Sequence, residues 1–252
     1  MTYKLLALDI DRTVTGHNLD VCSPRVYESL QKASKLVTII FVTARSVTQL
    51  NSFLANQELP AGYHAAENGA KVLNLDGSYA YDLHIPDIEV QQIVNATSSH
   101  FVEIGFLSDT DWYEDTDPVS AEENITGLSF TCSSLEEAKN LEKSLETLPH
   151  KYSTYVGAHW TNDKNLAAVL LFHKDGTKGF AMRYIQEKLG ISKEETIAIG
   201  DGATDISMFD AAGLRVAMAN SEEIMLENAD YICPAWDKDG VVDVIERYII
   251  SN

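Results

Sequence analysis

The sequence is poor in basic residues and in long apolar runs, and each shortage excludes a class of protein. Its 252 residues include 19 lysines and arginines against 38 aspartates and glutamates, which gives a formal charge of −19. Such a chain lacks the basic face that neutralises phosphates, so we expect no nucleic-acid partner. It is equally unsuited to anionic lipid, and no run of about 18 apolar residues would span a bilayer. We therefore expect no membrane association.

Cysteine is also scarce. Cys22, Cys132 and Cys233 are far apart and form neither a CxxC pair nor a Cys/His cluster. We therefore expect no disulfide framework and no zinc site, which fits a reducing, cytoplasmic location. The apolar run within residues 1–9 is too short for a signal peptide. What the chain does have, 45% hydrophobic and 9% aromatic residues, is enough for a full core.

Strand-like and helix-like segments alternate at both ends of the chain. In the first third we predict buried strands at 3–10, 37–42 and 63–66, and helices at 24–35 and 46–56. The last third has strands at 196–199, 214–218 and 230–232, between helices at 178–189, 206–211, 222–227 and from 241 onward. This alternation predicts an α/β fold, a Rossmann-like parallel sheet core with helices on both faces.

The middle of the chain has a different texture. A capping box at Ser134 and Glu137 opens a helix at 135–148, strands are expected at 152–160 and 167–172, and residues 109–123 form an acidic loop. We therefore predict an α+β cap domain of residues 81–174, inserted into a core domain made of residues 1–80 and 175–252.

Four polar clusters follow predicted strands or open predicted helices. They contain Asp9 and Asp11, Thr43, Lys178, and residues 200–205. Each cluster alone is explained more simply as a turn, a helix cap or a solvated lysine. Together they would meet at the carboxyl edge of the sheet, where ligands bind in such folds. Carboxylates gathered there repel by roughly 4 kcal/mol at 4 Å unless a cation compensates, and their oxygens suit Mg²⁺.

The combined pattern resembles the haloacid dehalogenase-like phosphohydrolase superfamily. Its four motifs stand in order as Asp9-x-Asp11-x-Thr13, Thr43, Lys178 and Gly200-Asp201-x-x-x-Asp205. The insert between the second and third motifs is similar to the cap of subclass IIB, the Cof-type and sucrose-phosphatase-like branch. Residues 67–70 and 216–220 also resemble stretches common in that branch.

The resemblance implies catalytic and metal-binding roles. Asp9 would be the nucleophile that forms an aspartyl-phosphate, and Asp11 would be the general acid and base. Mg²⁺ would be held by Asp9, the backbone carbonyl of Asp11 and Asp201. Asp205 and Asn220 would form a second layer around these groups, with Asp205 steering Lys178 or a metal-bound water.

The resemblance also implies how the phosphoryl group is held. Thr43, Lys178 and the backbone N–H groups of Ile10 and Ala44 would bind its oxygens, and Lys178 would also assist catalysis. The sequence departs from the superfamily pattern at three positions. Arg12 and Ala44 stand where glycine is usual, and Thr204 stands where subclass IIB commonly has a phosphate-binding asparagine. The phosphate-binding role of Thr204 therefore rests on its hydroxyl.

These observations favour a Mg²⁺-dependent phosphatase that acts on a small phosphorylated metabolite, with sugar phosphates first among them. Two alternatives stay open: a phosphomutase or phosphotransferase on a sugar phosphate, and a non-catalytic phosphate-ligand-binding protein on the same fold. Tyr155, His159 and Trp160 in the cap are interpreted first as packing residues, with a substrate pocket as the alternative. The sequence gives no indication of oligomeric state.

Overall fold

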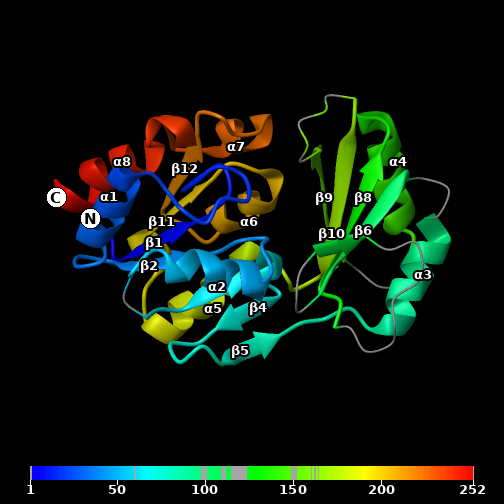
Figure 1. The fold of residues 1–252 in the computed structure, drawn as a ribbon, viewed down its shortest axis with the longest axis horizontal. Coiled ribbons are helices and arrows are strands. Elements are labelled where there is room, and N and C mark those ends of the chain that lie inside the picture. Colours follow the sequence, from blue (N-terminus) through cyan, green and yellow to red (C-terminus); the bar gives the residue numbers. More distant parts are fainter. Residues whose placement is uncertain are drawn as a thin grey trace.

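The computed structural model of the chain folds into two lobes, shown side by side in Figure 1. It describes residues 2–59, 61–97, 101–108, 112–114, 124–148, 152–159, 161, 163 and 165–251. The larger lobe carries both termini and the smaller lobe is formed by the middle of the chain. Trp160, and most of the acidic stretch 109–123, lie outside the described residues.

A five-stranded parallel sheet forms the centre of the larger lobe. Its strands, in spatial order, are β13 (Tyr231–Cys233), β12 (Leu214–Met218), β11 (Thr196–Gly200), β1 (Leu5–Leu8) and β2 (Thr38–Phe41). In space β1 lies between β11 and β2 and pairs in parallel with each of them. β1 and β11 are completely buried, as expected for strands covered on both faces.

Helices cover both faces of this sheet. On one face lie α1 (Pro24–Ala33), α2 (Val47–Ala55) and α8 (Gly240–Ile245), which continues as the π-helical turn η5 (Glu246–Ile250). On the other lie α5 (Lys178–Leu189), α6 (Ile206–Phe209) and α7 (Glu223–Asn228). Successive side chains of β1 point to opposite faces, so Leu6 joins the first cluster and Leu5 and Ala7 the second. Two 3₁₀ turns serve as connections: η2 (Lys193–Glu195) lies between α5 and β11, and η4 (Trp236–Lys238) lies between β13 and α8.

A small antiparallel sheet leads from the core toward the second lobe. It consists of β3 (His64–Ala66), β4 (Lys71–Leu73) and β5 (Tyr79–Asp82). Between β3 and β4 the 3₁₀ turn η1 (Glu67–Gly69) has three consecutive residues with positive φ. The last of these, Gly69, has no room for a side chain, since a Cβ would lie 2.4 Å from the carbonyl oxygen of Thr177.

The smaller lobe, called the insert below, is an antiparallel sheet covered on one face by two helices. The strand order is β7 (Trp112–Glu114), β6 (Glu103–Leu107), β8 (Gly127–Cys132), β10 (Ala167–His173) and β9 (Tyr152–Ala158). Its helices are α3 (Asp87–Thr97) and α4 (Leu135–Leu145). They bury an apolar core against one face of the sheet, and Figure 1 shows both on the side away from the larger lobe. The other face of the sheet is turned toward the core lobe.

The structure confirms the predicted fold class, a parallel α/β core with an inserted α+β lobe. Some elements differ from expectation. β1 ends at Leu8 rather than residue 10, because the Ile10 carbonyl accepts three backbone N–H groups and turns the chain. β4 to β8 and α3 were not predicted from the sequence. Within the described residues, no helix combines the length and apolarity that a bilayer crossing requires.

Candidate active site

The centre of the site is a buried ion cluster at the carboxyl edge of the core sheet. The Lys178 Nζ atom lies 2.6 Å from Asp9 Oδ1 and 2.5 Å from Asp205 Oδ1. The Asp205 carboxylate also accepts the backbone N–H groups of Asp201 and Gly202, at 2.9 and 3.0 Å. The side chains of Lys178, Asp9 and Asp205 are at most 6% exposed. Three residues separated by up to 196 positions therefore form one charge network.

Local structure explains why these side chains meet. Asp9 directly follows β1, and its N–H donates to Ile199 O on the neighbouring strand β11. Lys178 is the first residue of α5, whose N-cap is Thr177. Asp205 ends the 3₁₀ turn η3 (Ala203–Asp205) after β11. Gly200 precedes this turn, and a Cβ there would approach the Asp205 side chain to 2.5 Å. Glycine is thus needed for Asp205 to fold back over the strand end.

Burial and mutual repulsion perturb the acids of this cluster. Removal from water is the main reason that the pKa of Asp9 is raised to about 7, with Lys178 opposing the change. Burial likewise raises the pKa of Asp201 well above its usual range, and the Asp9 and Asp205 charges raise it further. Burial alone would lower the pKa of Lys178, but Asp205 and Asp9 raise it, so this lysine stays charged. The cluster therefore has more acidic groups than its lysine can neutralise, which favours uptake of a proton or a cation.

The same acids make a donor set for a divalent cation. Asp9, Asp201 and Asp205 each offer one carboxylate oxygen, and these oxygens lie within 4.8 Å of one another. An all-oxygen set with excess negative charge suits Mg²⁺, which commonly keeps waters beside one or two carboxylates. The residues present thus fit this ion. The set contains the Asp9 and Asp201 carboxylates of the sequence prediction and adds Asp205. The third ligand of that prediction, the backbone carbonyl of Asp11, stays a prediction.

The Asp11 carboxylate is turned to a different partner. Arg45 donates to both of its oxygens, through Nε at 2.8 Å and Nη2 at 3.0 Å. Arg45 also donates to Asp20 Oδ1 at 2.9 Å and to the Leu19 carbonyl at 2.9 Å. The backbone N–H of Asn18 donates to Asp11 as well, at 2.6 Å. The Arg45 side chain is only 3% exposed, so this fork holds the Asp11 carboxylate in a fixed orientation.

The predicted phosphate-binding residues of the second motif lie beside this fork. Thr43 is buried, and its hydroxyl accepts the Arg45 N–H at 3.1 Å. The Thr43 carbonyl accepts from Asn68 N, and Arg45 O accepts from Glu67 N, so the turn η1 supports the loop. Ala44 borders the cavity described below.

The first and fourth motifs place the remaining predicted residues. Ile10 is buried in the core, and its carbonyl closes the turn after Asp9. Thr204 lies in η3, where its carbonyl accepts from Ser207 Oγ at 3.3 Å. Asn220 lies farther from the acids: its Nδ2 donates to Arg12 O at 3.0 Å, and its Oδ1 accepts from Trp236 N at 3.0 Å. Asn220 therefore secures the loop that carries the first motif.

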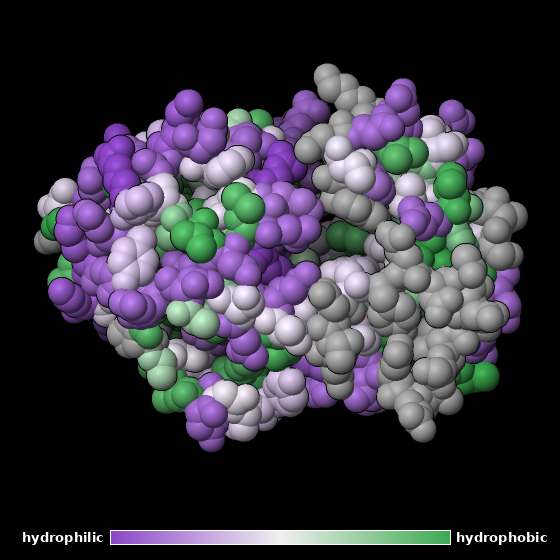
Figure 2. All heavy atoms as spheres, viewed as in Figure 1, coloured by the Kyte–Doolittle hydropathy of each residue, from purple (hydrophilic) through white to green (hydrophobic). Residues whose placement is uncertain are grey.

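A cavity of about 370 Å³ opens next to Asp11, between the core and the insert. Its floor comes from the core and its roof from the open face of the insert sheet, and Figure 2 shows a recess between the lobes. The core side is lined by Asp11, His17, Asn18, Ala44, Arg45 and Gln49. The insert side is lined by Gly105, Trp112, Ser129 and Leu170. A ligand here would touch both lobes.

At the other edge of the insert sheet, β9 reaches the ion cluster. The Tyr155 side chain lies near Asn68 and Ser207, and it is close enough to Lys178 and Asp205 for their charges to affect its pKa. Burial is the main cause that raises the pKa of this tyrosine. Tyr155 therefore does more than pack within the insert, because it also lies beside the ion cluster. His159, by contrast, is buried and bonded to Thr131 and Thr161 within the insert.

Sequence reasoning assigned no role to Arg45 or Asn68, and it gave Tyr155 a pocket role only as the alternative to packing. Arg45 directly follows the second motif, and a buried arginine between two acids was not visible in the linear pattern. Asn68 is in a stretch noted only for resemblance, and its positive φ of 56° and complete burial mark it as a special position. Its Oδ1 atom has no hydrogen-bond partner among the described residues.

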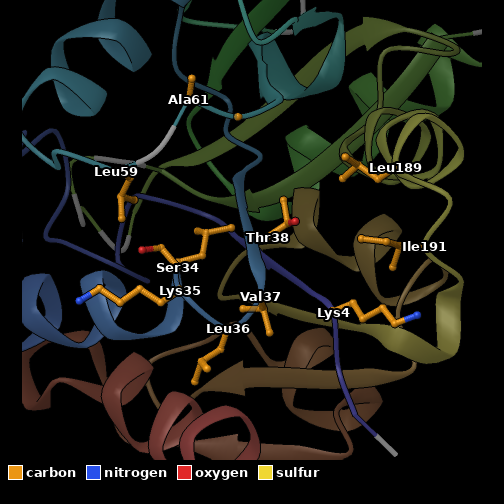
Figure 3. Close-up of a pocket in the computed structure, with 12 residues that line it drawn as sticks. Lys4, Ser34, Lys35, Leu36, Val37, Thr38, Leu59, Ala61, Leu189 and Ile191 are labelled. Carbon is orange, nitrogen blue, oxygen red and sulfur yellow. The ribbon is translucent and has the colours of Figure 1, made fainter.

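A larger cavity, of about 530 Å³, lies elsewhere. Lys4, Val37 and Thr38 line it, and these residues stand at the starts of β1 and β2 (Figure 3). It is therefore at the opposite edge of the parallel sheet from Asp9. None of the predicted site residues lines it, so it is separate from the ion cluster.

Comparison with known proteins gives matches over the whole chain. Residues 6–130 and 118–245 match the haloacid dehalogenase-like hydrolase family. A phosphoglycolate phosphatase of Methanobrevibacter smithii is 27% identical over 99% of this chain and 100% of its own length. A haloacid dehalogenase-like hydrolase from B. subtilis has a similar fold, with a TM-score of 0.84 and 18% identity over 98% of this chain and all of its own. A subclass IIB sugar phosphatase has a TM-score of 0.74 and 23% identity, covering 97% and 98% of the two chains.

Proposed function

Because the chain belongs to the haloacid dehalogenase-like hydrolase family, we propose that it is a Mg²⁺-dependent phosphatase that hydrolyses a sugar phosphate through an aspartyl-phosphate. The observation that carries this proposal is the buried network of Asp9, Lys178 and Asp205 beside a cavity that contains Asp11. A nucleophile, a cation for the phosphoryl group and a second carboxylate for proton transfer are the groups that phosphate-ester hydrolysis needs.

In this mechanism the tasks are divided among the residues of the site. An Asp9 oxygen attacks phosphorus, and the bond from phosphorus to the leaving oxygen breaks. Asp11 gives its proton to that oxygen, then takes a proton from the water that hydrolyses the aspartyl-phosphate. Lys178 and the Thr43 hydroxyl bind phosphoryl oxygens. Mg²⁺, when held by Asp9, Asp201 and Asp205, would neutralise charge on the phosphoryl group.

The position of Asp11 supports its role in proton transfer. It lies at the wall of the cavity. The Arg45 fork donates to both oxygens, so one of them would leave the fork when Asp11 carries the proton. A leaving group in the cavity would present its oxygen to this carboxyl group. The insert would form the roof as a cap and keep bulk water away from the aspartyl-phosphate.

The cavity lining supports a neutral, hydroxyl-rich leaving group. Asn18, Gln49 and Ser129 offer amide and hydroxyl groups, while Trp112 and Leu170 offer apolar surface. Such a mixture suits the polar edges and apolar faces of a sugar. At about 370 Å³ the cavity also has room for more than a two-carbon acid.

The same lining is poorly suited to a carboxylate such as that of phosphoglycolate, the substrate named for the Methanobrevibacter relative. Among the described residues that line the cavity, Arg45 and His17 can carry positive charge. Arg45 is committed to Asp11, Asp20 and Leu19 O, and His17 Nδ1 lies 3.8 Å from Asp11. A carboxylate would therefore meet a cavity wall whose cations are already paired.

The test is phosphate release with Mg²⁺ over a panel that contains hexose and pentose phosphates, alditol phosphates and phosphoglycolate. We expect turnover of at least one sugar or alditol phosphate with a higher kcat/KM than phosphoglycolate. Formation of an isomerised sugar phosphate without phosphate release would instead indicate a phosphomutase. Binding of the esters without any turnover would indicate a ligand-binding protein. A higher kcat/KM for phosphoglycolate would contradict the substrate class.

A further inference from the structure

Arg12 occupies a backbone conformation that normally favours glycine. Its φ is +57°, in the left-handed region, where any side chain is strained relative to glycine. It lies between Asp11 and Thr13, in the loop that carries the nucleophile. Strained residues of this kind occur mostly at functional sites, so the contacts of the Arg12 side chain are informative.

The guanidinium group of Arg12 contacts Asp201, one of the acids of the proposed metal site. Its Nε atom lies 3.4 Å from Asp201 Oδ2, and its Nη2 donates to Asn220 O at 3.2 Å. Asn220 in turn donates from Nδ2 to the Arg12 carbonyl at 3.0 Å. Both the backbone and the side chain of Arg12 are therefore anchored, which holds its charge at Asp201.

The distribution of charge gives this contact its significance. Lys178 bonds Asp9 and Asp205, whereas Arg12 is the cation in contact with Asp201 among the described residues. Asp201 is 8% exposed at its side chain and Arg12 is 40% exposed. Asp201 is therefore a buried acid that is paired with a partly exposed cation, Arg12.

We propose that Arg12 is a tethered counter-ion that competes with Mg²⁺ for Asp201 and so weakens the affinity of the site for the metal. This inference rests on the proposed Mg²⁺ site. A divalent cation bound to Asp201 would lie near the positive charge of Arg12. If Arg12 stays in place the two charges repel, and if it moves away its ion pair with Asp201 is lost, so both cases oppose metal binding. The residue would thereby set the metal concentration at which the enzyme is active.

A direct contact between Arg12 and the leaving group is the competing explanation. It is less favoured because Arg12 does not line the cavity beside Asp11. Its hydrogen bond and ion pair, to Asn220 O and Asp201, both stay within the core lobe. The two explanations differ in what they predict for metal binding in the absence of any phosphate ester.

The test is titration of the full-length protein with Mg²⁺ by calorimetry, repeated with Mn²⁺ by electron paramagnetic resonance, with no phosphate ester present. The variants are Arg12→Gln, which removes the charge, and Arg12→Gly, which suits the positive φ. Arg215→Gln is the matched control, because Arg215 also pairs with an aspartate, Asp230, and its side chain is 41% exposed. We expect both Arg12 variants to bind Mg²⁺ about 3- to 30-fold more tightly than wild type, and the control to be unchanged.

Ionic strength supplies a second readout. Because the competition is between partly exposed charges, the fold difference in Mg²⁺ affinity between Arg12→Gln and wild type should shrink as salt rises. Unchanged or weaker Mg²⁺ binding by both Arg12 variants, with wild-type binding intact, would overturn the inference and leave the proposed function standing. Absence of Mg²⁺ binding in the wild type and in every variant would overturn both.

Discussion

The Arg45 fork allows a sharp test of how Asp11 is controlled. Replacing Arg45 with Met removes the charge and all four side-chain hydrogen bonds, while keeping an unbranched apolar stem beside the Phe53 ring, 5.7 Å from the guanidinium carbon. Hydrogen bonds to charged groups contribute about 1.5–3 kcal/mol each, and breaking a buried ion pair costs about 3–5 kcal/mol.

The loss of stability in Arg45→Met is smaller than these figures suggest, because both aspartates are partly exposed to water. The Asp11 and Asp20 side chains are 23% and 40% exposed, so water partly replaces the lost partner. We therefore expect Arg45→Met to lower the free energy of unfolding by about 2–4 kcal/mol, below a plain sum of the bonds. Urea denaturation measures this, with Arg215→Met at the exposed Asp230 pair as the control, expected to change by at most about 1 kcal/mol.

Catalysis separates a positioning role from a structural one. If Arg45 orients Asp11, its loss should slow esters that need a protonated leaving group far more than p-nitrophenyl phosphate, whose leaving group is stable as an anion. The upper limit is the roughly 10²–10⁴-fold that a general acid supplies. Equal slowing of both substrates, measured as kcat on refolding-competent protein, would refute the positioning role. Arg45→Lys, which retains charge without the fork, should fall between wild type and Arg45→Met.

Three further predictions concern the cap contact, the turn and the buried acids. Tyr155→Phe should raise KM for the phosphate ester. The control is Tyr152→Phe, which loses a hydrogen bond to Glu89 on the helix-covered face of the same strand and should leave KM unchanged. Similar KM changes in both variants would argue against a site role for Tyr155. Gly69→Ala should lower the free energy of unfolding by about 2 kcal/mol or more in urea titrations, because of the 2.4 Å approach and the φ of +90°. Because the pKa of Asp9 is raised by burial to about 7, its metal-free folded form binds a proton that the unfolded chain has released, so stability falls as pH rises from about 4 to 7. The increase in melting temperature on adding Mg²⁺ should therefore be larger at pH 8 than at pH 5, and the reverse order would contradict the assignment.

The ion cluster was accessible from the sequence because its geometry follows from topology. Parallel strands end at one edge of a sheet, so Asp9 after β1 and Asp201 after β11 must lie close together. Lys178 at the start of α5 then faces the same edge, since its N-cap Thr177 contacts the turn at Gly69. The relation between Asp9 and Asp201 depends on strand order alone and needs no knowledge of side-chain packing.

Arg45 and Tyr155 were not accessible in the same way. The Arg45 fork depends on the loop that brings Asp11 and Asp20 to one guanidinium, and no periodicity records that loop. Tyr155 belongs to an antiparallel strand whose approach to the core depends on how the two lobes dock. The insert strand β8 was missed although its sequence carries the signal of a strand, since Leu128, Phe130 and Cys132 alternate with Ser129 and Thr131.

The central claim is that Asp9 is the nucleophile of a Mg²⁺-dependent phosphatase. The most direct measurement is phosphate release from the best sugar phosphate by wild type and Asp9→Asn, both saturated with Mg²⁺ and both checked for folding by circular dichroism. The amide cannot attack phosphorus, so we predict that Asp9→Asn releases phosphate at the background rate while the fold is retained. Turnover by a folded Asp9→Asn variant at the wild-type rate would contradict the account.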